Sequence, residues 1–321
     1  MKYRQLGDTG IEVSEIGFGA WQIGGPVRVY FEDRGWISHG WGQVDDEESI
    51  RLIKSSGDMG INFIDTAGGY GHGHSEEVVG CAIKGERHKW IIETKGGEGM
   101  EDNVRWRDFS KKRLLRQIDE SLQRLNTDYV DVYLLHGPSR EDMARGECLE
   151  AIMEIKEKGK ARSVGVSVGD HTMTKDFICN YSLDVIQIIF NIINQGNTRE
   201  ILPLARAHGV GLVARRVMAG GFLAGKITEK TEFAPDDRRS WESREQQLKL
   251  INIVEKLRAL EKPGRSMAQV CLKYPLTFPE ISTVIPGSKS IQSMKENIGA
   301  SKAPDFTDEE LQFIKEIQRG I

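Results

Sequence analysis

The sequence predicts a (β/α)8 barrel, also called a TIM barrel, that residues 1–321 form as one domain. From residue 45 onwards, short apolar segments alternate with longer segments that show a helical pattern. Strands that alternate with helices in this way form a parallel sheet, and eight such strands close into a barrel. A chain of 321 residues is long for an ordinary domain but common for an α/β barrel.

The N-terminal part of the chain predicts a cap and a long loop. Segments 3–6 and 11–14 flank the turn sequence GDTG and predict a β-hairpin, which we expect to cap the barrel. Residues 20–43 show no clear period, and a loop of this length in a compact domain usually has a function. We expect its aromatic rings to form the wall of a substrate pocket, with burial of a partner chain as the alternative. These rings belong to Trp21, Tyr30, Phe31, Trp36 and Trp41.

The repeat itself can be followed along the chain. Its strands are expected at residues 15–19, 61–65, 90–95, 129–136, 162–167, 185–190, 211–215 and 283–285. Its helices are expected at 45–59, 75–84, 109–125, 148–158, 176–181, 199–208, 266–276 and 290–300, and 176–181 has the weakest pattern. Pro275 should kink or end the seventh helix. Residues 242–260 and 307–319 predict extra helices near the C-terminus, and 226–240 predicts a mobile loop.

Charge and composition point to a small-molecule partner. Acidic residues (48) and basic residues (44) are interspersed and give a net charge of -4, which argues against binding to nucleic acid or to a membrane surface. The four cysteines are scattered, and no apolar run approaches the roughly 20 residues of a membrane helix. His72 and His74 lack the spacing of a helical zinc pair. We therefore expect a reduced, cytoplasmic protein without a metal site, and its oligomeric state stays open.

Four ionisable residues follow consecutive strands of the expected barrel. Asp65, Lys95 and His136 end the second, third and fourth strands, and Tyr70 comes five residues after Asp65 in a glycine-rich turn. Residues at these strand ends meet on one rim of a barrel, where active sites lie. A lysine close to a tyrosine can lower the tyrosine's pKa by roughly 1 to 3 units from its usual value near 10. The group suits the polarisation and protonation of a carbonyl.

The chain resembles the aldo-keto reductases in motifs that follow one another in the expected order over nearly its whole length. These motifs are YRQLGDTGIEVSEIGFGAW, GINFIDTAGGYGHGHSEEVVG, ETKGG, SLQRLNTDYVDVYLLHGPS, GKARSVGVS, AGGFLAGK and VIPGSKSIQSMKENIGA. The resemblance implies a (β/α)8 barrel that binds NADP(H) without a Rossmann domain. It places the family's catalytic tetrad on Asp65, Tyr70, Lys95 and His136. It also implies hydride transfer between the nicotinamide and a carbonyl or alcohol substrate, with Tyr70 as the general acid and base.

The resemblance also implies a set of cofactor contacts. They are Trp21, Ser167, Gln187, Arg215, Arg216, Val217, Met218, Gly220, Gly287, Ser288, Lys289, Glu296 and Asn297. Arg215 stands where many relatives have a tyrosine that stacks on the nicotinamide; its guanidinium could stack, pair with a phosphate or form a structural salt bridge. Lys289 is the main candidate for the 2′-phosphate, so NADPH is expected to be preferred over NADH. The runner-up function is a nucleotide-sensing regulatory subunit built on the same barrel.

Glu93 has no counterpart in the resemblance. Side chains alternate along a strand, so Glu93 should point into the barrel one layer below Lys95. A buried acid needs a partner, and Lys95 and Arg162 are the two candidates. A local bulge that turns Glu93 outward is the alternative.

Overall fold

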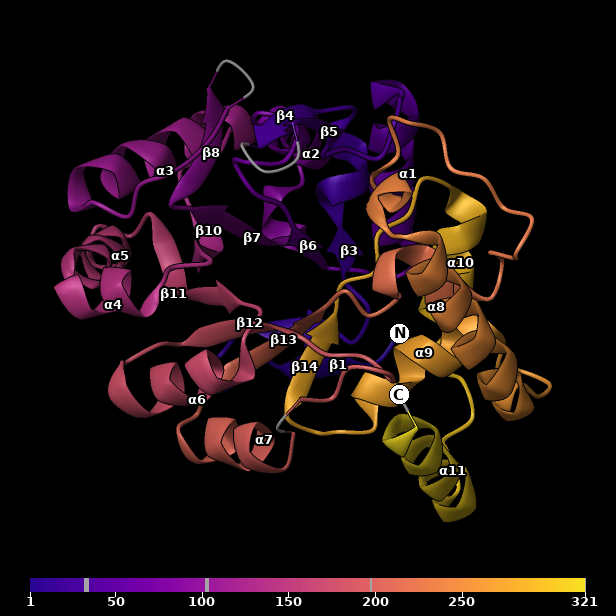
Figure 1. Ribbon diagram of the computed structural model, residues 1–321. Helices are drawn as coiled ribbons and strands as arrows, with labels where there is room; N and C mark the ends of the chain where they lie inside the picture. The colour runs from indigo at the N-terminus through magenta and orange to yellow at the C-terminus, as the bar shows by residue number, and fades with distance from the viewer. Residues whose placement is uncertain (32–34, 102–103, 197, 321) are drawn as a thin grey trace.

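Eight parallel strands form the centre of the molecule in this computed structural model, which describes residues 1–31, 35–101, 104–196 and 198–320 (Figure 1). Their order in the sheet is β14-β13-β12-β11-β10-β7-β6-β3. The strands are β3 (Phe18–Gly19), β6 (Phe63–Asp65), β7 (Ile91–Gly96), β10 (Val130–His136), β11 (Ala161–Val168), β12 (Val185–Ile189), β13 (Gly211–Arg215) and β14 (Ile281–Val284). Parallel bridges from Ile16 to Val284 and from Gly19 to Gly287 join the first strand to the last. The predicted (β/α)8 barrel is confirmed.

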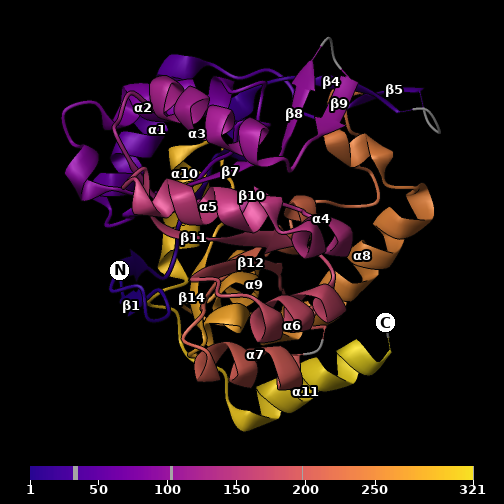
Figure 2. The same cartoon turned by 90° about the vertical axis from the view of Figure 1, so that its left-hand side faces the viewer.

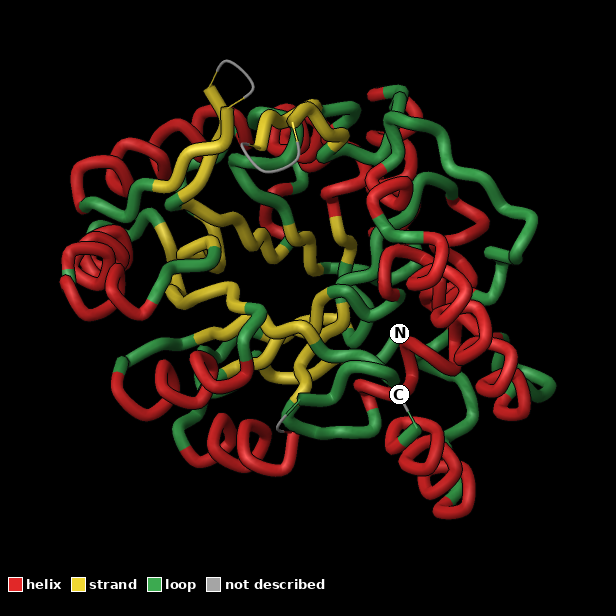
Figure 3. Tube along the Cα trace, viewed as in Figure 1, coloured by secondary structure: helices red, strands yellow, loops and turns green. Residues whose placement is uncertain are grey.

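Each barrel strand is followed by a helix that lies outside the sheet (Figures 1 and 3). These helices are α1 (Asp46–Asp58), α2 (His74–Ile83), α3 (Lys111–Leu125), α5 (Glu147–Glu157), α6 (His171–Asn180), α7 (Thr198–Ala207), α9 (Met267–Leu276) and α10 (Ile291–Gly299). Asp45 caps α1, where its carboxylate accepts a hydrogen bond of 2.8 Å from the Glu48 N–H. The expected helix at 176–181 is wrong in its bounds, because Asp170 caps a full helix from residue 171.

The N-terminal hairpin closes the barrel at the amino ends of the strands. Strands β1 (Tyr3–Gln5) and β2 (Glu12–Ser14) pair antiparallel, as predicted. The side chains of Leu6, Ile11 and Val13 are fully buried and pack in one cluster with barrel residues such as Val132 and Val213. Burial of these apolar side chains stabilises the cap against this end of the barrel.

A second, four-stranded sheet, which the sequence pattern does not predict, lies above the barrel (Figure 2). Its strands are β4 (Arg28–Phe31), β5 (Gly35–Ser38), β8 (Glu98–Glu101) and β9 (Val104–Arg107). The expectation of a long irregular loop at 20–43 is therefore wrong, because this segment forms the short helix η1 (Ala20–Gly24) and then the β4–β5 hairpin. Each of these strands spans only four residues, which is too short for a clear period.

The remaining elements lie mostly near the C-terminus. They are η2 (Arg87–Lys89), α4 (Arg140–Arg145), η3 (Ala219–Ala224), η4 (Arg238–Trp241), α8 (Arg244–Leu257), η5 (Arg258–Leu260) and α11 (Asp308–Arg319). The two predicted extra helices correspond to α8 with η5 and to α11. Pro275 lies in the last turn of α9, which ends one residue later at Leu276. No helix in the described ranges is long and apolar enough to cross a membrane.

Candidate active site

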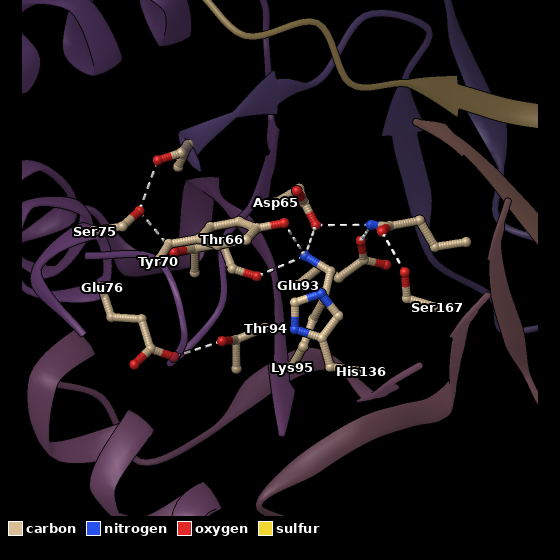
Figure 4. A network of polar contacts seen from close by, with 12 residues as sticks. Asp65, Thr66, Tyr70, Ser75, Glu76, Glu93, Thr94, Lys95, His136 and Ser167 are labelled. Atoms are coloured by element: carbon tan, nitrogen blue, oxygen red, sulfur yellow. Dashed lines mark hydrogen bonds and ion pairs between the residues drawn. The ribbon is translucent and has the colours of Figure 1, made fainter. Parts of the chain in front are cut away.

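A cavity of about 880 Å³ opens at the carboxyl ends of the barrel strands. Asp65, Tyr70 and His136 line it, whereas Lys95 lies behind them and is almost completely buried. The four residues come from β6, the loop after β6, β7 and β10, and the closing of the barrel brings them together (Figure 4). The structure therefore brings the four predicted ionisable groups together: Asp65, Tyr70 and Lys95 share polar contacts, and the His136 ring lies edge-on to the Tyr70 ring.

Lys95 is the centre of this network. Its ammonium group forms an ion pair with Asp65 and donates hydrogen bonds to the Thr66 carbonyl oxygen at 2.8 Å and the Tyr70 hydroxyl at 3.2 Å. All three ammonium protons therefore have acceptors, as a buried cation requires. Proximity to Asp65 and Tyr70 raises the pKa of Lys95 despite burial, so the lysine is a cation throughout the neutral range.

Tyr70 points its hydroxyl at Lys95 from a turn that is packed against η1. Gly71 has a φ of 66°, and a Cβ there would lie 2.0 Å from the Gly24 carbonyl oxygen, so only glycine fits. The Tyr70 ring stacks on Trp21, with 5.8 Å between ring centroids and an interplanar angle of 22°. Burial and the Asp65 charge raise the pKa of Tyr70 to about 12, and Lys95 offsets only part of this rise. The expectation that Lys95 lowers the pKa of Tyr70 below its usual value is wrong for the protein without cofactor, because burial raises this pKa by more than Lys95 lowers it.

His136 lies beside Glu98, a contact that the sequence pattern does not predict. Nδ1 of His136 lies 3.1 Å from Oε1 of Glu98, a residue of strand β8, but the two atoms do not have the geometry of a hydrogen bond. Burial lowers the pKa of His136 to about 4, although Glu98 acts to raise it. The imidazole is therefore neutral at neutral pH. Two arginines of β9 also contact Glu98: Arg105 in an ion pair, and Arg107 at 3.7 Å.

Glu93 lies below Lys95 with its side chain fully buried, as the strand alternation predicted. Its partner is neither candidate cation: Oε1 accepts a hydrogen bond of 2.6 Å from Nε2 of Gln187. Arg162 instead donates to Asp131 at 2.7 Å on the outside of the barrel. The pairing predicted for Glu93 is therefore wrong. Glu93 and Ser163 both lie opposite Val132 in register, so Arg162, one residue before Ser163, points to the other face of its strand. Lys95 pairs with Asp65 instead.

All thirteen predicted cofactor residues line the cavity. They are Trp21, Ser167, Gln187, Arg215, Arg216, Val217, Met218, Gly220, Gly287, Ser288, Lys289, Glu296 and Asn297. The Lys289 ammonium donates to the carbonyl oxygens of Trp41 and of Gln43, the latter at 3.1 Å. Glu296 forms an ion pair with Lys226 at 2.7 Å.

The charges of the cavity fit an anionic ligand such as a dinucleotide. Basic lining residues (Arg105, Arg107, Arg215, Arg216, Lys226, Arg238, Arg239, Lys289) outnumber acidic ones (Asp65, Glu98, Asp170, Asp237, Glu296). The buried Nε atoms of Arg215 and Arg238 have no hydrogen-bond acceptor among the described residues. Buried donors without acceptors are costly, so phosphate oxygens would stabilise both side chains.

Only part of the predicted aromatic wall lies at the cavity. Trp21 and Trp41 line it, with ring centroids 5.5 Å apart. Tyr30 and Trp36 do not line it but pack on each other in the second sheet and are half exposed. The Phe31 side chain lies outside the described residues. The cavity instead gains His39, which directly follows β5, and Arg238, whose guanidinium lies 4.7 Å from the centre of the Trp21 ring.

His74, at the end of the glycine-rich turn, has structural contacts. Nε2 of His74 lies 3.0 Å from the Asp46 carboxylate, and Nδ1 lies 3.3 Å from the Gly24 carbonyl oxygen. Within the described part of the chain, no three metal-binding side chains gather in one place.

The chain is similar to proteins of one family. A sequence model of the Aldo/keto reductase family matches residues 15–319. Aldo-keto reductase YhdN of Bacillus subtilis (strain 168) is 32% identical over 297 residues, covering 90% of this chain and 85% of the relative. The NADH-specific methylglyoxal reductase of Escherichia coli (strain K12) is 28% identical and covers 100% of this chain and 99% of its own. The holo form of an aldo-keto reductase from Bacillus halodurans matches with a TM-score of 0.81 at 30% identity, covering 99% of this chain and 96% of that chain.

Proposed function

Because the chain belongs to the Aldo/keto reductase family, we propose that it transfers a hydride between NADP(H) and a carbonyl or alcohol substrate. Members of this family are oxidoreductases that act on small carbonyl compounds with nicotinamide cofactors. The observation that carries the proposal is the hydrogen bond of 3.2 Å from the buried Lys95 cation to the hydroxyl of Tyr70, which faces the cavity.

Tyr70 is the general acid for reduction and the general base for oxidation in this proposal. With a pKa of about 12 it keeps its proton at neutral pH and gives it up only to a strong base, such as the alkoxide that forms as a carbonyl is reduced. The Lys95 cation stabilises the tyrosinate that remains, and Asp65 holds Lys95 in place. Neutral His136, whose ring centroid lies 6.1 Å from that of Tyr70, orients the substrate oxygen by a hydrogen bond. The nicotinamide, when bound, supplies or accepts the hydride.

The cofactor in this proposal is NADP(H), with NADPH preferred over NADH. Lys289, next to the N-terminus of α10, is the residue that would hold the 2′-phosphate, because a helix N-terminus and a cation both favour phosphate. Ser167 and Gln187 would hold the carboxamide. The arginines 215, 216 and 238 would face the pyrophosphate or the nicotinamide ring. One relative is named as NADH-specific, so the affinities of this protein for NADPH and for NADH are to be measured side by side.

We further propose that residues 1–321 act as one domain in the cytoplasm. Support comes from the family match over residues 15–319 and from the four cysteines, all of which are free thiols.

The test is a screen of aldehydes, ketones and sugars with NADPH and with NADH, run in both directions. We expect NADPH-dependent reduction of some carbonyl compounds by the wild type and none by Tyr70→Phe. Arg116→Gln is a suitable control, because Arg116 lies on the exposed side of α3, where it pairs with Glu120. Tight binding of NADPH without turnover of any compound would instead favour the nucleotide-sensing regulatory subunit.

A further inference from the structure

Below the catalytic network, two carboxyl groups share one amide. Asp65 and Glu93 lie directly opposite each other in neighbouring strands, and both are almost completely buried. Nε2 of Gln187 donates to Oδ1 of Asp65 at 2.8 Å and to Oε1 of Glu93 at 2.6 Å (Figure 4). The two acceptors fix the orientation of the amide, because its nitrogen must face both of them. Both of its protons are therefore used inside the protein.

The charges around Glu93 do not balance if both acids are ionised. The groups that face Glu93 are Asp65 from β6, Lys95 from β7 and the neutral amide of Gln187 from β12. The cation is already paired with Asp65, and its other two protons go to the Thr66 carbonyl and the Tyr70 hydroxyl. Ionised Glu93 would thus be a second buried anion beside Asp65, without a cation of its own. Such a charge is costly, and the usual response is uptake of a proton.

The second oxygen of Glu93 indicates where that proton lies. Oε2 is buried and has no hydrogen-bond donor among the described residues. As the oxygen of a carboxylate, it would lack the hydrogen bond that a buried acceptor requires. As a hydroxyl, it becomes a donor, and the Asp65 carboxylate beside it is the acceptor. Burial, and then the Asp65 charge, hold the pKa of Glu93 well above its usual value.

We propose that Glu93 is a protonated carboxylic acid that positions Asp65 and Gln187 beneath the active site. The inference deepens the proposed function, because Asp65 holds Lys95 and Gln187 faces the cavity. Glu93 donates to Asp65 and accepts from Gln187, so it fixes both without adding charge. Because the Gln187 amide nitrogen donates both of its protons to Asp65 and Glu93, Gln187 presents only Oε1 to the cavity. This oxygen already accepts a hydrogen bond of 2.8 Å from the Ser167 hydroxyl. Gln187 and Ser167 therefore act as acceptors toward a ligand amide, a direction that Glu93 imposes.

The first test detects the proton itself. Infrared spectra of the purified protein should contain the C=O stretch of a protonated carboxylic acid at neutral pH, and Glu93→Gln should remove it. Glu76→Gln is the matched control, because Glu76 is equally buried but is paired with Arg124 at 2.7 Å. Absence of the band in the wild type, or its persistence in Glu93→Gln, would overturn the proposal. This test needs no turnover, so it is independent of the reductase assignment.

The second test uses the pH dependence of stability. Glu93 with a raised pKa binds a proton in the folded protein that it releases in the unfolded chain above about pH 4.3. From there up to the pKa of folded Glu93, the unfolding equilibrium constant of the wild type should rise tenfold per pH unit relative to that of Glu93→Gln. Parallel pH dependences for the two proteins, or a Glu93→Gln protein that does not fold, would contradict a neutral Glu93.

The third test separates positioning from charge in catalysis. Glutamine keeps the donor, the acceptor and the neutral charge, so Glu93→Gln should retain kcat/KM within about twofold and the same pH profile. Glu93→Leu keeps the volume but neither hydrogen bond, and it should lose about tenfold in kcat/KM. A shifted pH profile for Glu93→Gln would show that the wild-type residue is charged. If neither protein reduces any substrate, the proposed function fails while the infrared and stability tests still decide the state of Glu93.

Discussion

Replacement of Asp65 by asparagine should expose how the buried Lys95 charge is balanced. Asparagine keeps an oxygen for Lys95 and for Gln187, so the change removes mainly the negative charge. Opposite charges about 3 Å apart interact by roughly 5 kcal/mol at an effective dielectric constant of about 20. Loss of one partner of a buried ion pair typically costs about 3–5 kcal/mol of stability. The structure adds a second source of charge, because Glu93 lies opposite Asp65 and can release its proton when Asp65 is neutral.

The cost of Asp65→Asn should therefore depend on residue 93. In the Glu93→Gln background nothing can replace the lost charge, and we expect the full decrease of about 3–5 kcal/mol in the free energy of unfolding. With Glu93 present, the decrease should be smaller by at least about 1 kcal/mol. The measurement is a double-mutant cycle by urea denaturation at pH 7, followed by fluorescence and circular dichroism. A coupling energy below about 0.5 kcal/mol would refute the idea that the two carboxyl groups share the role of counter-ion.

Three further outcomes are expected. Tyr70→Phe should abolish carbonyl reduction but leave NADPH affinity nearly unchanged, because phenylalanine keeps the ring that stacks on Trp21. Turnover assays test the loss of reduction, and equilibrium binding on the same preparation tests the NADPH affinity. Lys289→Ala should weaken NADPH binding by about 10- to 100-fold, as for a lost charge-assisted hydrogen bond, and leave NADH binding nearly unchanged; equal losses would move the 2′-phosphate site elsewhere. We expect the His136 pKa of about 4 to set the acidic limit of kcat/KM. The Glu98 charge raises that pKa, so Glu98→Gln should shift the limit to lower pH by up to about one unit. If the limit does not move, His136 is not the group that sets it.

Sequence patterns alone determined the barrel and the order of its elements. The strands that carry Asp65, Lys95 and His136 at or next to their ends alternate with helices, and this local pattern is enough because parallel strands need a helical crossover. The positions of these residues at the ends of neighbouring strands also placed them on one rim. The same alternation predicted that Glu93 points into the barrel beneath Lys95.

The tertiary structure alone decided which groups touch and what charge they carry. Gln187 reaches Glu93 from a strand 94 positions away in the sequence, so no local pattern could identify it as the partner. Glu98 meets His136 because a second hairpin folds over the barrel mouth, and its strands are too short for a clear period. The pKa of Tyr70 depends on how completely it is buried and on the distances to Asp65 and Lys95. Burial and distance are properties of the closed barrel, and the sequence specifies them only through the whole fold.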